Sequence, residues 1–233
     1  MTLLSICQDI ARNSRVKVPS TIIGNTELEA VSLLQAITET VADLLKRIDW
    51  QELQAEATIT TVASTAGYDL PTNFDRITNE TAWNVTRKLP MLGTTSAKEW
   101  QNLKNATENG STTVDFYRIR GSQILVYPTP SSVESLIYEY TQNTPVESSG
   151  GTAKAGWTVD TDVPRIDAFL VELGARWRFK RLLGKPYQED LAQFNETALL
   201  KSGSDGGRRT ITPRVRVSNG MKWAYPETVA APL

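Results

Sequence analysis

Histidine is absent from the 233-residue sequence, and cysteine occurs only once, as Cys7. The lack of histidine removes the commonest general base and the commonest metal ligand of proteins. A single cysteine excludes an intramolecular disulfide bond and any zinc site built from several cysteines. Cys7 falls on the apolar side of a short helical pattern, so we interpret it as a buried small hydrophobic residue. We therefore expect no metal and no cofactor.

A large net charge and long apolar runs are absent as well. Lys and Arg number 25 against 26 Asp and Glu, so the bulk charge does not indicate a protein that coats nucleic acid. No apolar run reaches the roughly 18 residues that a membrane span needs. The N-terminus lacks the basic segment of a signal peptide. We expect synthesis in the cytoplasm and no membrane partner.

The motifs of common catalytic and nucleotide-binding sites are also missing. The sequence contains no GxxxxGKS or GxxxxGKT loop and no GxSxG elbow. Two carboxylate pairs, Asp160 with Asp162 and Glu189 with Asp190, lie at or near predicted helix N-termini, where the helix dipole favours them. Asp160 and Asp162 also resemble part of a calcium loop, but the glycine and the closing glutamate of that loop are missing. We expect a protein that is not an enzyme.

The segment 162–202 carries the strongest helical pattern. Gly184 and Pro186 predict a stop between two helices, because glycine suits the position after a helix and proline suits the first turn of the next. Apolar residues at helical spacing predict one stripe on each helix. The first stripe comprises Ile166, Phe169, Leu170, Leu173, Trp177, Leu182 and Leu183, and the second comprises Tyr187, Leu191, Phe194 and Ala198.

Two further helices are predicted in the first fifty residues. The first covers about residues 3–15, and the second follows a cap at Asn25 or Thr26. We interpret Trp50, just after the second helix, as a cap on the end of the bundle. The apolar stripe predicted for the second helix comprises Leu28, Val31, Leu34, Ile37, Val41, Leu44, Leu45 and Ile48.

The middle of the chain has the alternating pattern of β-strands. Strands are predicted at 57–64, 81–86 and 133–143, the last with Leu136, Tyr138 and Tyr140 on one face, and a short helix is predicted at 96–104. A hairpin over 114–128 turns at Gly121–Ser122. It carries Val114, Phe116 and Ile119 on one arm and Ile124, Val126 and Pro128 on the other. Residues 146–156 are predicted to form a polar loop.

Neither pair of helices can bury its apolar stripe alone, so both are expected to share one core. The predicted fold class is α+β: a helical bundle built from both chain ends, an inserted all-β subdomain and an extended C-terminal arm. The predicted boundaries are 1–54 and 160–203 for the two halves of the bundle, 55–159 for the β subdomain and 204–233 for the arm.

Two sets of cationic residues are candidates for binding partners. A basic band at the end of the third helix either pairs with acidic neighbours, contacts nucleic acid or forms an interface. The arm is either an unstructured terminus or a partner-binding segment, since its aromatic residues are of the kind enriched in interfaces. The basic band is Arg176, Arg178, Lys180 and Arg181, and the candidate residues of the arm are Arg208, Arg209, Arg214, Arg216, Trp223 and Tyr225.

Six passages together resemble phage head-to-tail adaptors, the connector proteins that dock beneath the portal. The passages are LLSICQDIA, ADLLKRIDWQEL, YDLPTNFDRIT, AWNVTRKLPMLGTTSAKEWQ, FYRIRGSQILVYPTP and LGARWRFKRLLGKPYQEDLAQFNETAL. They extend from about residue 3 to residue 203, and their order is more specific than any one of them.

The resemblance implies a structural virion protein in the neck between head and tail. Such adaptors form a ring, commonly of twelve subunits, that extends the DNA channel below the portal and provides a platform for the tail. The implied partners are the portal protein, a tail nozzle or tail-tube protein, further copies of the chain, and genomic DNA that passes without sequence recognition. In several such adaptors a C-terminal arm extends along the portal. The resemblance therefore implies the same role for the arm residues named above.

Two alternatives remain open from the sequence. One is a head-completion or tail-terminator protein at another level of the neck. The other, from a different class, is an enzyme that degrades the cell wall. Negative-stain images with and without portal distinguish the first alternative, and a peptidoglycan turbidity assay tests the second.

Overall fold

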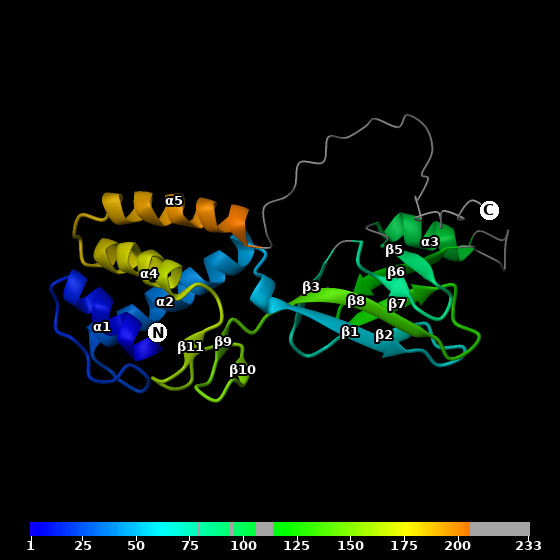
Figure 1. The fold of residues 1–233 in the computed structure, drawn as a ribbon, viewed down its shortest axis with the longest axis horizontal. Helices are drawn as coiled ribbons and strands as arrows, with labels where there is room; N and C mark the ends of the chain where they lie inside the picture. The colour runs from blue at the N-terminus through cyan, green and yellow to red at the C-terminus, as the bar shows by residue number, and fades with distance from the viewer. Residues whose placement is uncertain (79, 94–95, 106–113, 206–233) are drawn as a thin grey trace, which may run out of the picture.

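The computed structural model describes residues 1–78, 80–93, 96–105 and 114–205. The fold is α+β, as predicted: within these residues four helices gather at one end of an elongated molecule, and a large sheet with one further helix occupies the other end (Figure 1). The candidate residues of the arm, from Arg208 to Tyr225, lie outside the described residues.

Four helices form the helical unit: α1 (Leu3–Asn13), α2 (Leu28–Arg47), α4 (Ala168–Leu182) and α5 (Gln188–Ser204). Helix α4 packs against the other three, so it is the centre of the unit. One apolar core joins residues from all four helices, including Ile6, Cys7, Leu44 and Phe179. Cys7 is completely buried, as expected, and burial raises the pKa of its thiol to about 12.

The buried face of α2 differs from the predicted one. Leu28 is 80% exposed and Val31 is also exposed, whereas the small residues Ala30, Ala36 and Thr40 are buried together with Leu33. The reason is the close approach of α4, which requires small side chains where the two helices meet. A stripe drawn through the largest apolar residues therefore has the wrong orientation over the first half of this helix.

The helical hairpin is confirmed in its turn and corrected in part of its stripe. Gly184 has a φ of 65°, the left-handed conformation expected after a helix. Leu170, Leu173, Phe194 and Ala198 are buried as predicted. The exposed members of the predicted stripe are Phe169, Leu182 and Leu183, and the buried residues that it missed include Val171 and Phe179.

The β unit contains one eight-stranded sheet in the order β1-β8-β4-β5-β6-β7-β2, with β3 paired to β8 beside this path. All the pairings in it are antiparallel except the parallel pair β5–β6. The strands are β1 (Gln54–Thr60), β2 (Gly67–Asp69), β3 (Phe74–Ile77), β4 (Trp83–Asn84), β5 (Leu89–Gly93), β6 (Asp115–Arg120), β7 (Gln123–Tyr127) and β8 (Ser135–Gln142). Helix α3 (Ala97–Asn105) begins beside Ser96, whose hydroxyl accepts a hydrogen bond from Glu99 N.

The hairpin β6–β7 turns at the predicted position, and Tyr117 is the buried aromatic residue of its first strand. Arg120 pairs with Gln123, so Gly121 and Ser122 form the turn. Tyr117, rather than Phe116, is buried. Apolar residues occur on both faces of β6, so alternation alone did not identify the inward face. In β8 the predicted inward residues Leu136, Tyr138 and Tyr140 are all buried.

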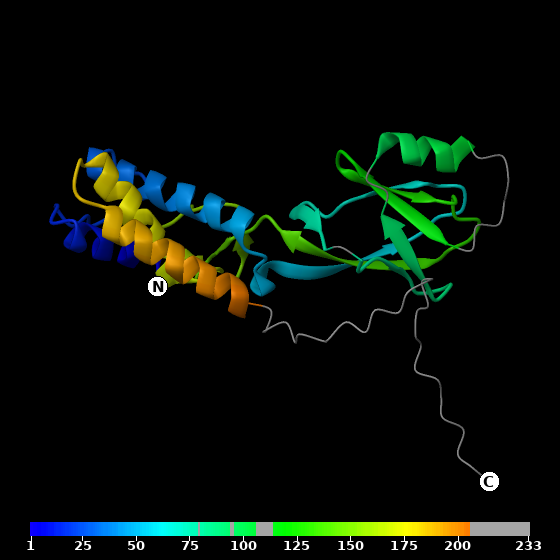
Figure 2. The same cartoon turned by 90° about the horizontal axis from the view of Figure 1, so that it is seen from above.

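The predicted polar loop contains a second, three-stranded sheet. Strands β9 (Val146–Glu147), β10 (Ala153–Lys154) and β11 (Val163–Pro164) pair in the order β10-β9-β11. Both views place this small sheet beside the helical unit (Figures 1 and 2). Each strand has only two residues, too few for an alternating pattern to be visible in the sequence.

The N-terminus is fixed against the loop before β11. Leu3 N and Leu4 N donate hydrogen bonds to Asp162 O and Asp160 O, at 2.8 and 3.1 Å. The Asp160 carboxylate accepts hydrogen bonds from Ile22 N and Ile23 N. These contacts join the first 25 residues to the loop that leads into α4, so both ends of the described chain contribute to the helical unit.

Candidate interaction surfaces

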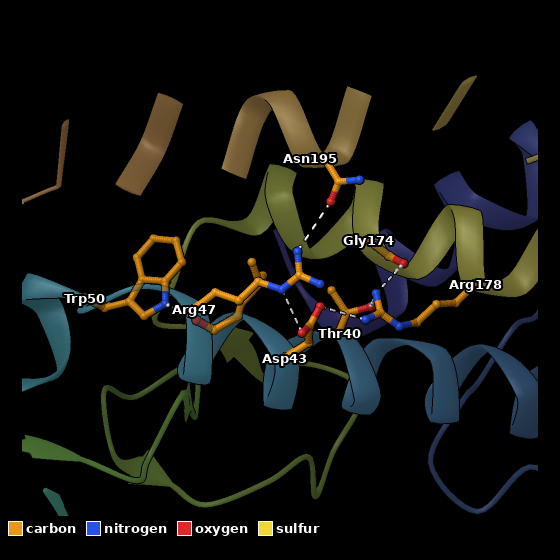
Figure 3. A network of polar contacts seen from close by, with 8 residues as sticks. Thr40, Asp43, Arg47, Trp50, Gly174, Arg178 and Asn195 are labelled. Atoms are coloured by element: carbon orange, nitrogen blue, oxygen red, sulfur yellow. Dashed lines mark hydrogen bonds and ion pairs between the residues drawn. The ribbon is translucent and has the colours of Figure 1, made fainter. Parts of the chain in front are cut away.

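Arg178 of the basic band is buried inside the helical unit (Figure 3). Its guanidinium donates hydrogen bonds to Thr40 Oγ1 at 3.1 Å and Gly174 O at 3.0 Å, and pairs with the Asp43 carboxylate at 2.9 Å. It also stacks over the Trp177 ring, 4.4 Å from the ring centroid. All its main contacts are thus within the chain, where it links α2 to α4.

Arg176 and Lys180 share one carboxylate on α5. The Asp190 carboxylate lies 2.8 Å from Arg176 Nε and 2.6 Å from Lys180 Nζ. Asp190 is buried, so the two cations compensate its charge where α4 and α5 meet. Of the predictions for these cations, pairing with acidic neighbours describes the geometry that is present.

Arg181 is the exposed member of the band. Its guanidinium lies 5.3 Å from the Trp177 ring centroid, and it makes no ion pair with a described carboxylate. The four cations of the band are neighbours in the sequence. Packing separates them, because the helix directs Arg178 toward α2 and Arg181 toward solvent.

The two predicted carboxylate pairs have structural roles. Asp190 lies in the first turn of α5, as predicted, whereas Asp167 is the residue that caps α4. Asp162 is fully buried and accepts hydrogen bonds from Lys154 Nζ, Thr158 N and Val159 N, at 2.7, 2.7 and 3.0 Å. Burial by itself raises the pKa of this carboxyl, but these bonds outweigh it and hold the pKa well below its ordinary value.

Helix α5 presents apolar side chains to solvent. Leu199 and Leu200 are 74% and 68% exposed, although Phe194 and Ala198 on the same helix are buried. Leu199 also lines a groove of about 210 Å³ with residues of α2 and α5, among them Arg47, Asn195 and Ser202. We call Leu199, Leu200 and this groove the α5 surface. Leu199 and Leu200 directly follow Ala198, the last residue of the predicted stripe, which did not include them. Two adjacent leucines at this place are a signal of the α5 surface that is visible in the sequence.

A second exposed apolar surface lies at the end of the helical unit that is farthest from the sheet. The start of α2 and the turn between α4 and α5 occupy this end in both views (Figures 1 and 2). The exposed residues there are Leu28, Val31, Leu182 and Leu183, which we call the distal-end surface. All four residues were predicted to lie in the buried stripes of their helices. Because they are exposed instead, they are available to partners.

A junction joins the helical unit to the sheet. Arg165, just before α4, donates hydrogen bonds to Gln142 Oε1 at the end of β8 and to Glu52 O in the short 3-10 helix Gln51–Leu53, at 2.6 and 2.7 Å. Trp50 is buried at the end of α2, as predicted, and its indole N–H donates to Leu44 O (Figure 3). The two units are therefore tied by side chains as well as by strands β1 and β8.

The described residues contain no cluster of histidine, cysteine, aspartate or glutamate that is arranged to hold a metal ion. No helix among them is sufficiently long and apolar to cross a membrane. The buried charged side chains Arg178 and Asp190 form ion pairs with other side chains of the helical unit. The described part of the molecule presents exposed apolar side chains on its helices and, in the basic band, the exposed cation Arg181.

The chain matches the SU10 adaptor protein family over residues 1–218, and it belongs to that family. It is therefore a phage structural adaptor, a component of the virion that contacts other capsid or tail proteins. A comparison with curated proteins found no significant match.

Proposed function

We propose that this protein is the head-to-tail adaptor that docks beneath the portal. The family match over residues 1–218 carries the proposal, because it extends through the helical unit, the sheet and the first part of the arm. In this role the chain assembles into a ring, with twelve subunits expected, that extends the DNA channel and provides the attachment platform for the tail.

Two exposed apolar surfaces support assembly into a ring. Neighbours in a cyclic ring meet through a heterologous contact, in which one surface of a subunit packs against a different surface of the next. The α5 surface and the distal-end surface are two such regions, located on different parts of the helical unit. We assign the α5 surface to the contact between neighbours, since its groove lies beside exposed leucines.

The architecture proposed for this role is a bundle formed by both chain ends, an inserted β subdomain and a C-terminal arm. The helical core supports the first two parts, since residues 1–53 and 166–198 contribute to one cluster and the sheet has its own. The arm carries five cationic residues and one acidic residue after position 205, which suits an acidic partner surface. We assign the portal contact to Arg208, Arg209, Arg214, Arg216, Trp223 and Tyr225.

Arg181 is the member of the basic band that we retain as a contact residue. Arg176, Arg178 and Lys180 pair with carboxylates of the same chain, so their part in an interface is to position α4 and α5 rather than to bind a partner directly.

The test of the arm is a binding experiment on portal-containing heads. Three forms of the protein are compared: the full chain, a chain that ends at Asp205, and the full chain with Trp223→Ala and Tyr225→Ala. We expect the full chain to sediment with the heads, the shortened chain to remain free, and the double variant to bind at least tenfold more weakly, since aromatic hot spots contribute about 2 kcal/mol or more each. Normal attachment of the shortened chain would refute the arm's role.

Negative-stain images of the same samples test the level in the neck. Density directly below the portal supports the adaptor assignment. Density elsewhere in the neck would instead favour a head-completion or tail-terminator protein. Ring formation by the purified protein is scored separately, so the failure of portal binding and the failure of assembly are distinguishable.

A further inference from the structure

Strand β3 has an open edge. It pairs with β8 along one side, and no described strand pairs with its other side. An unpaired strand edge presents backbone N–H and C=O groups that accept an additional strand. The pairing with β8 is irregular between Phe74 and Arg76, which is typical of strands at the border of a sheet.

A cavity of about 670 Å³ lies along this strand. Five consecutive residues, from Phe74 to Thr78, line it together with Ile119 of β6 and Asp49 at the junction, and Gln54 of β1 and Thr141 of β8 complete the lining. Its apolar wall is half-buried: Phe74, Ile77 and Ile119 are each partly exposed to solvent. The cavity therefore offers apolar contact beside unpaired backbone groups, the combination that a docked strand requires.

The charge at the cavity favours a cationic occupant. Asp49 and Asp75 share one cation, Arg76, at 2.5 and 2.6 Å. The Asp49 side chain is 77% exposed, so it is accessible to another positively charged group. Because two carboxylates share one guanidinium, the cluster of Asp49, Asp75 and Arg76 has a net charge of −1.

The C-terminal segment begins next to the cavity. The Asp205 carboxylate accepts a hydrogen bond from Gln51 N at 3.1 Å, and Gln51 follows Asp49 by two residues. A link of four residues, 206–209, reaches about 13 Å when extended. The segment that follows is thus within reach of the β3 edge of its own chain.

The sequence of that segment has the period of a half-buried strand. Over residues 210–217, TITPRVRV, the odd positions hold Ile211, Pro213, Val215 and Val217, and the even positions hold threonine and arginine. The segment lacks a second apolar face, so it needs an existing sheet to cover its one apolar side. Pro213 has no N–H, which restricts the segment to a sheet edge with the odd-position N–H groups directed away from the neighbouring strand.

We propose that residues 210–217 dock on the open edge of β3 of the same chain as an additional strand. The apolar odd positions cover Phe74 and Ile77. The even positions direct their backbone N–H groups toward β3 and hold Arg214 and Arg216 near the Asp49–Asp75 carboxylates. In the free subunit this docking anchors the base of the arm at the junction and leaves Trp223 and Tyr225 beyond it.

The orientation of Pro213 supplies a matched pair of variants. Arg216→Pro and Arg216→Ala remove the same charge, but only the proline removes an N–H that bonds to β3. Hydrogen exchange is measured on the full-length protein in the absence of any partner. We expect the amides of Asp75–Ile77 that face away from β8 to exchange about tenfold or more faster in Arg216→Pro than in the native protein, and Arg216→Ala to retain most of the protection. Phe74 N is left out because it already donates a hydrogen bond to Pro71 O.

Strand β2 is the internal control, because it also pairs with a single strand, β7, in the described structure. Its amides should exchange at the same rate in all three proteins. Equal exchange in β3 for the native protein and Arg216→Pro would overturn the proposal. Protection of β3 that disappears on dilution would overturn it too, since it would assign the docked segment to a second copy. The result is independent of portal binding, so this proposal and the proposed function can fail separately.

Discussion

Buried charges in the helical unit are matched by partners on other helices. Arg178 bonds to Thr40 and Asp43, more than 130 residues earlier in the chain, and Asp190 compensates Arg176 and Lys180. A buried ion that loses its partner destabilises a protein strongly, because its desolvation is no longer compensated. These side chains thus make the relative positions of α2, α4 and α5 specific.

Asp162 should make stability depend on pH in the acidic range. Its pKa is lowered in the folded protein, so its contribution is present above the unfolded value of about 4 and is lost as the pH falls below it. Asp162→Asn should reduce the free energy of unfolding at pH 7 by about 1–3 kcal/mol, because the pairing with Lys154 is lost. Urea unfolding of both proteins at pH 7, 5 and 3 measures this.

The difference between native protein and Asp162→Asn should shrink from pH 7 to pH 3. The control is Asp69→Asn, since Asp69 is an exposed carboxylate of the same type. A difference that stays constant with pH would show that the Asp162 carboxylate does not act through its charge.

Gly174 lies where α4 closely approaches α2 and α5. A Cβ atom there would lie 2.3 Å from Thr40 Cγ2 and 2.8 Å from Phe194 Cε2, inside their contact distance. Gly174→Ala should therefore lower the free energy of unfolding by about 1–3 kcal/mol or more. Gly203→Ala is the matched control in α5: it meets no atom within 4 Å and should raise stability by roughly 0.5 kcal/mol. Chemical denaturation measures both, and a neutral Gly174→Ala would contradict the packing of α2 against α4.

Among the four helices of the helical unit, α5 has the smallest share of the core. Phe194 and Ala198 are its buried apolar residues, whereas the longer α2 buries several along its length. Its ion pairs and narrow apolar strip fasten it to α4, and the remainder of its surface is available. A helix held in this way can contribute to the monomer and to a contact between subunits at once.

Leu199→Lys combined with Leu200→Lys should impair assembly without unfolding the monomer. Both side chains are already mostly exposed, so the free energy of unfolding should change by less than about 0.5 kcal/mol. Lysines on the α5 surface oppose burial against a neighbour, so we expect loss of the proposed ring species in analytical ultracentrifugation. Val133→Lys, at a residue of similar exposure in the β unit, is the control. Unchanged oligomers in the double variant would exclude the α5 surface as the contact.

At the scale of the whole molecule, two separate cores are held at a defined distance. The helical cluster and the sheet cluster share no residue. The chain passes between them at β1 and after the end of β8 (Figure 2), and Arg165 donates a hydrogen bond across the junction to Gln142. An adaptor that contacts several partners needs these units in a fixed relation. Arg165 helps to fix the two units relative to each other, because its hydrogen-bond acceptors lie on both sides of the junction.

Arg165→Ala should leave both cores folded and broaden the distribution of distances between them. The variant loses the hydrogen bonds to Gln142, Thr144 and Glu52 that cross the junction. Spin labels at exposed Ala192 and Ser122 would report the distance, and Cys7 does not interfere because it is fully buried. Arg120→Ala, at an exposed position of the β unit, is the control. An equally narrow distribution in Arg165→Ala would show that the strands alone hold the units in place.

Much of the secondary structure was predictable, whereas burial was predictable only in part. The turns at Gly184 and at Gly121–Ser122 follow from local backbone preferences, and they were predicted correctly. The face of α2 was not, because Leu28 and Val31 are as apolar as the residues that α4 covers. The small sheet β9–β11 was missed for a similar reason: its two-residue strands are stabilised by neighbours and not by a pattern of their own.

The sequence by itself determined the order of the helices, the β-rich character of the middle of the chain, the sharp turns at Gly121–Ser122 and Gly184, and the absence of histidine-based chemistry. These depend on residues close together in the chain, and so does the family resemblance. Only the tertiary structure decided which cations are buried and which side chains remain on the surface, as Arg178 and Arg181 show. It also decided that Asp160 binds Ile22 and that Asp205 meets Gln51. The physical reason is that burial and pairing depend on which distant segments pack together, and helical or strand periodicity contains no information about that choice.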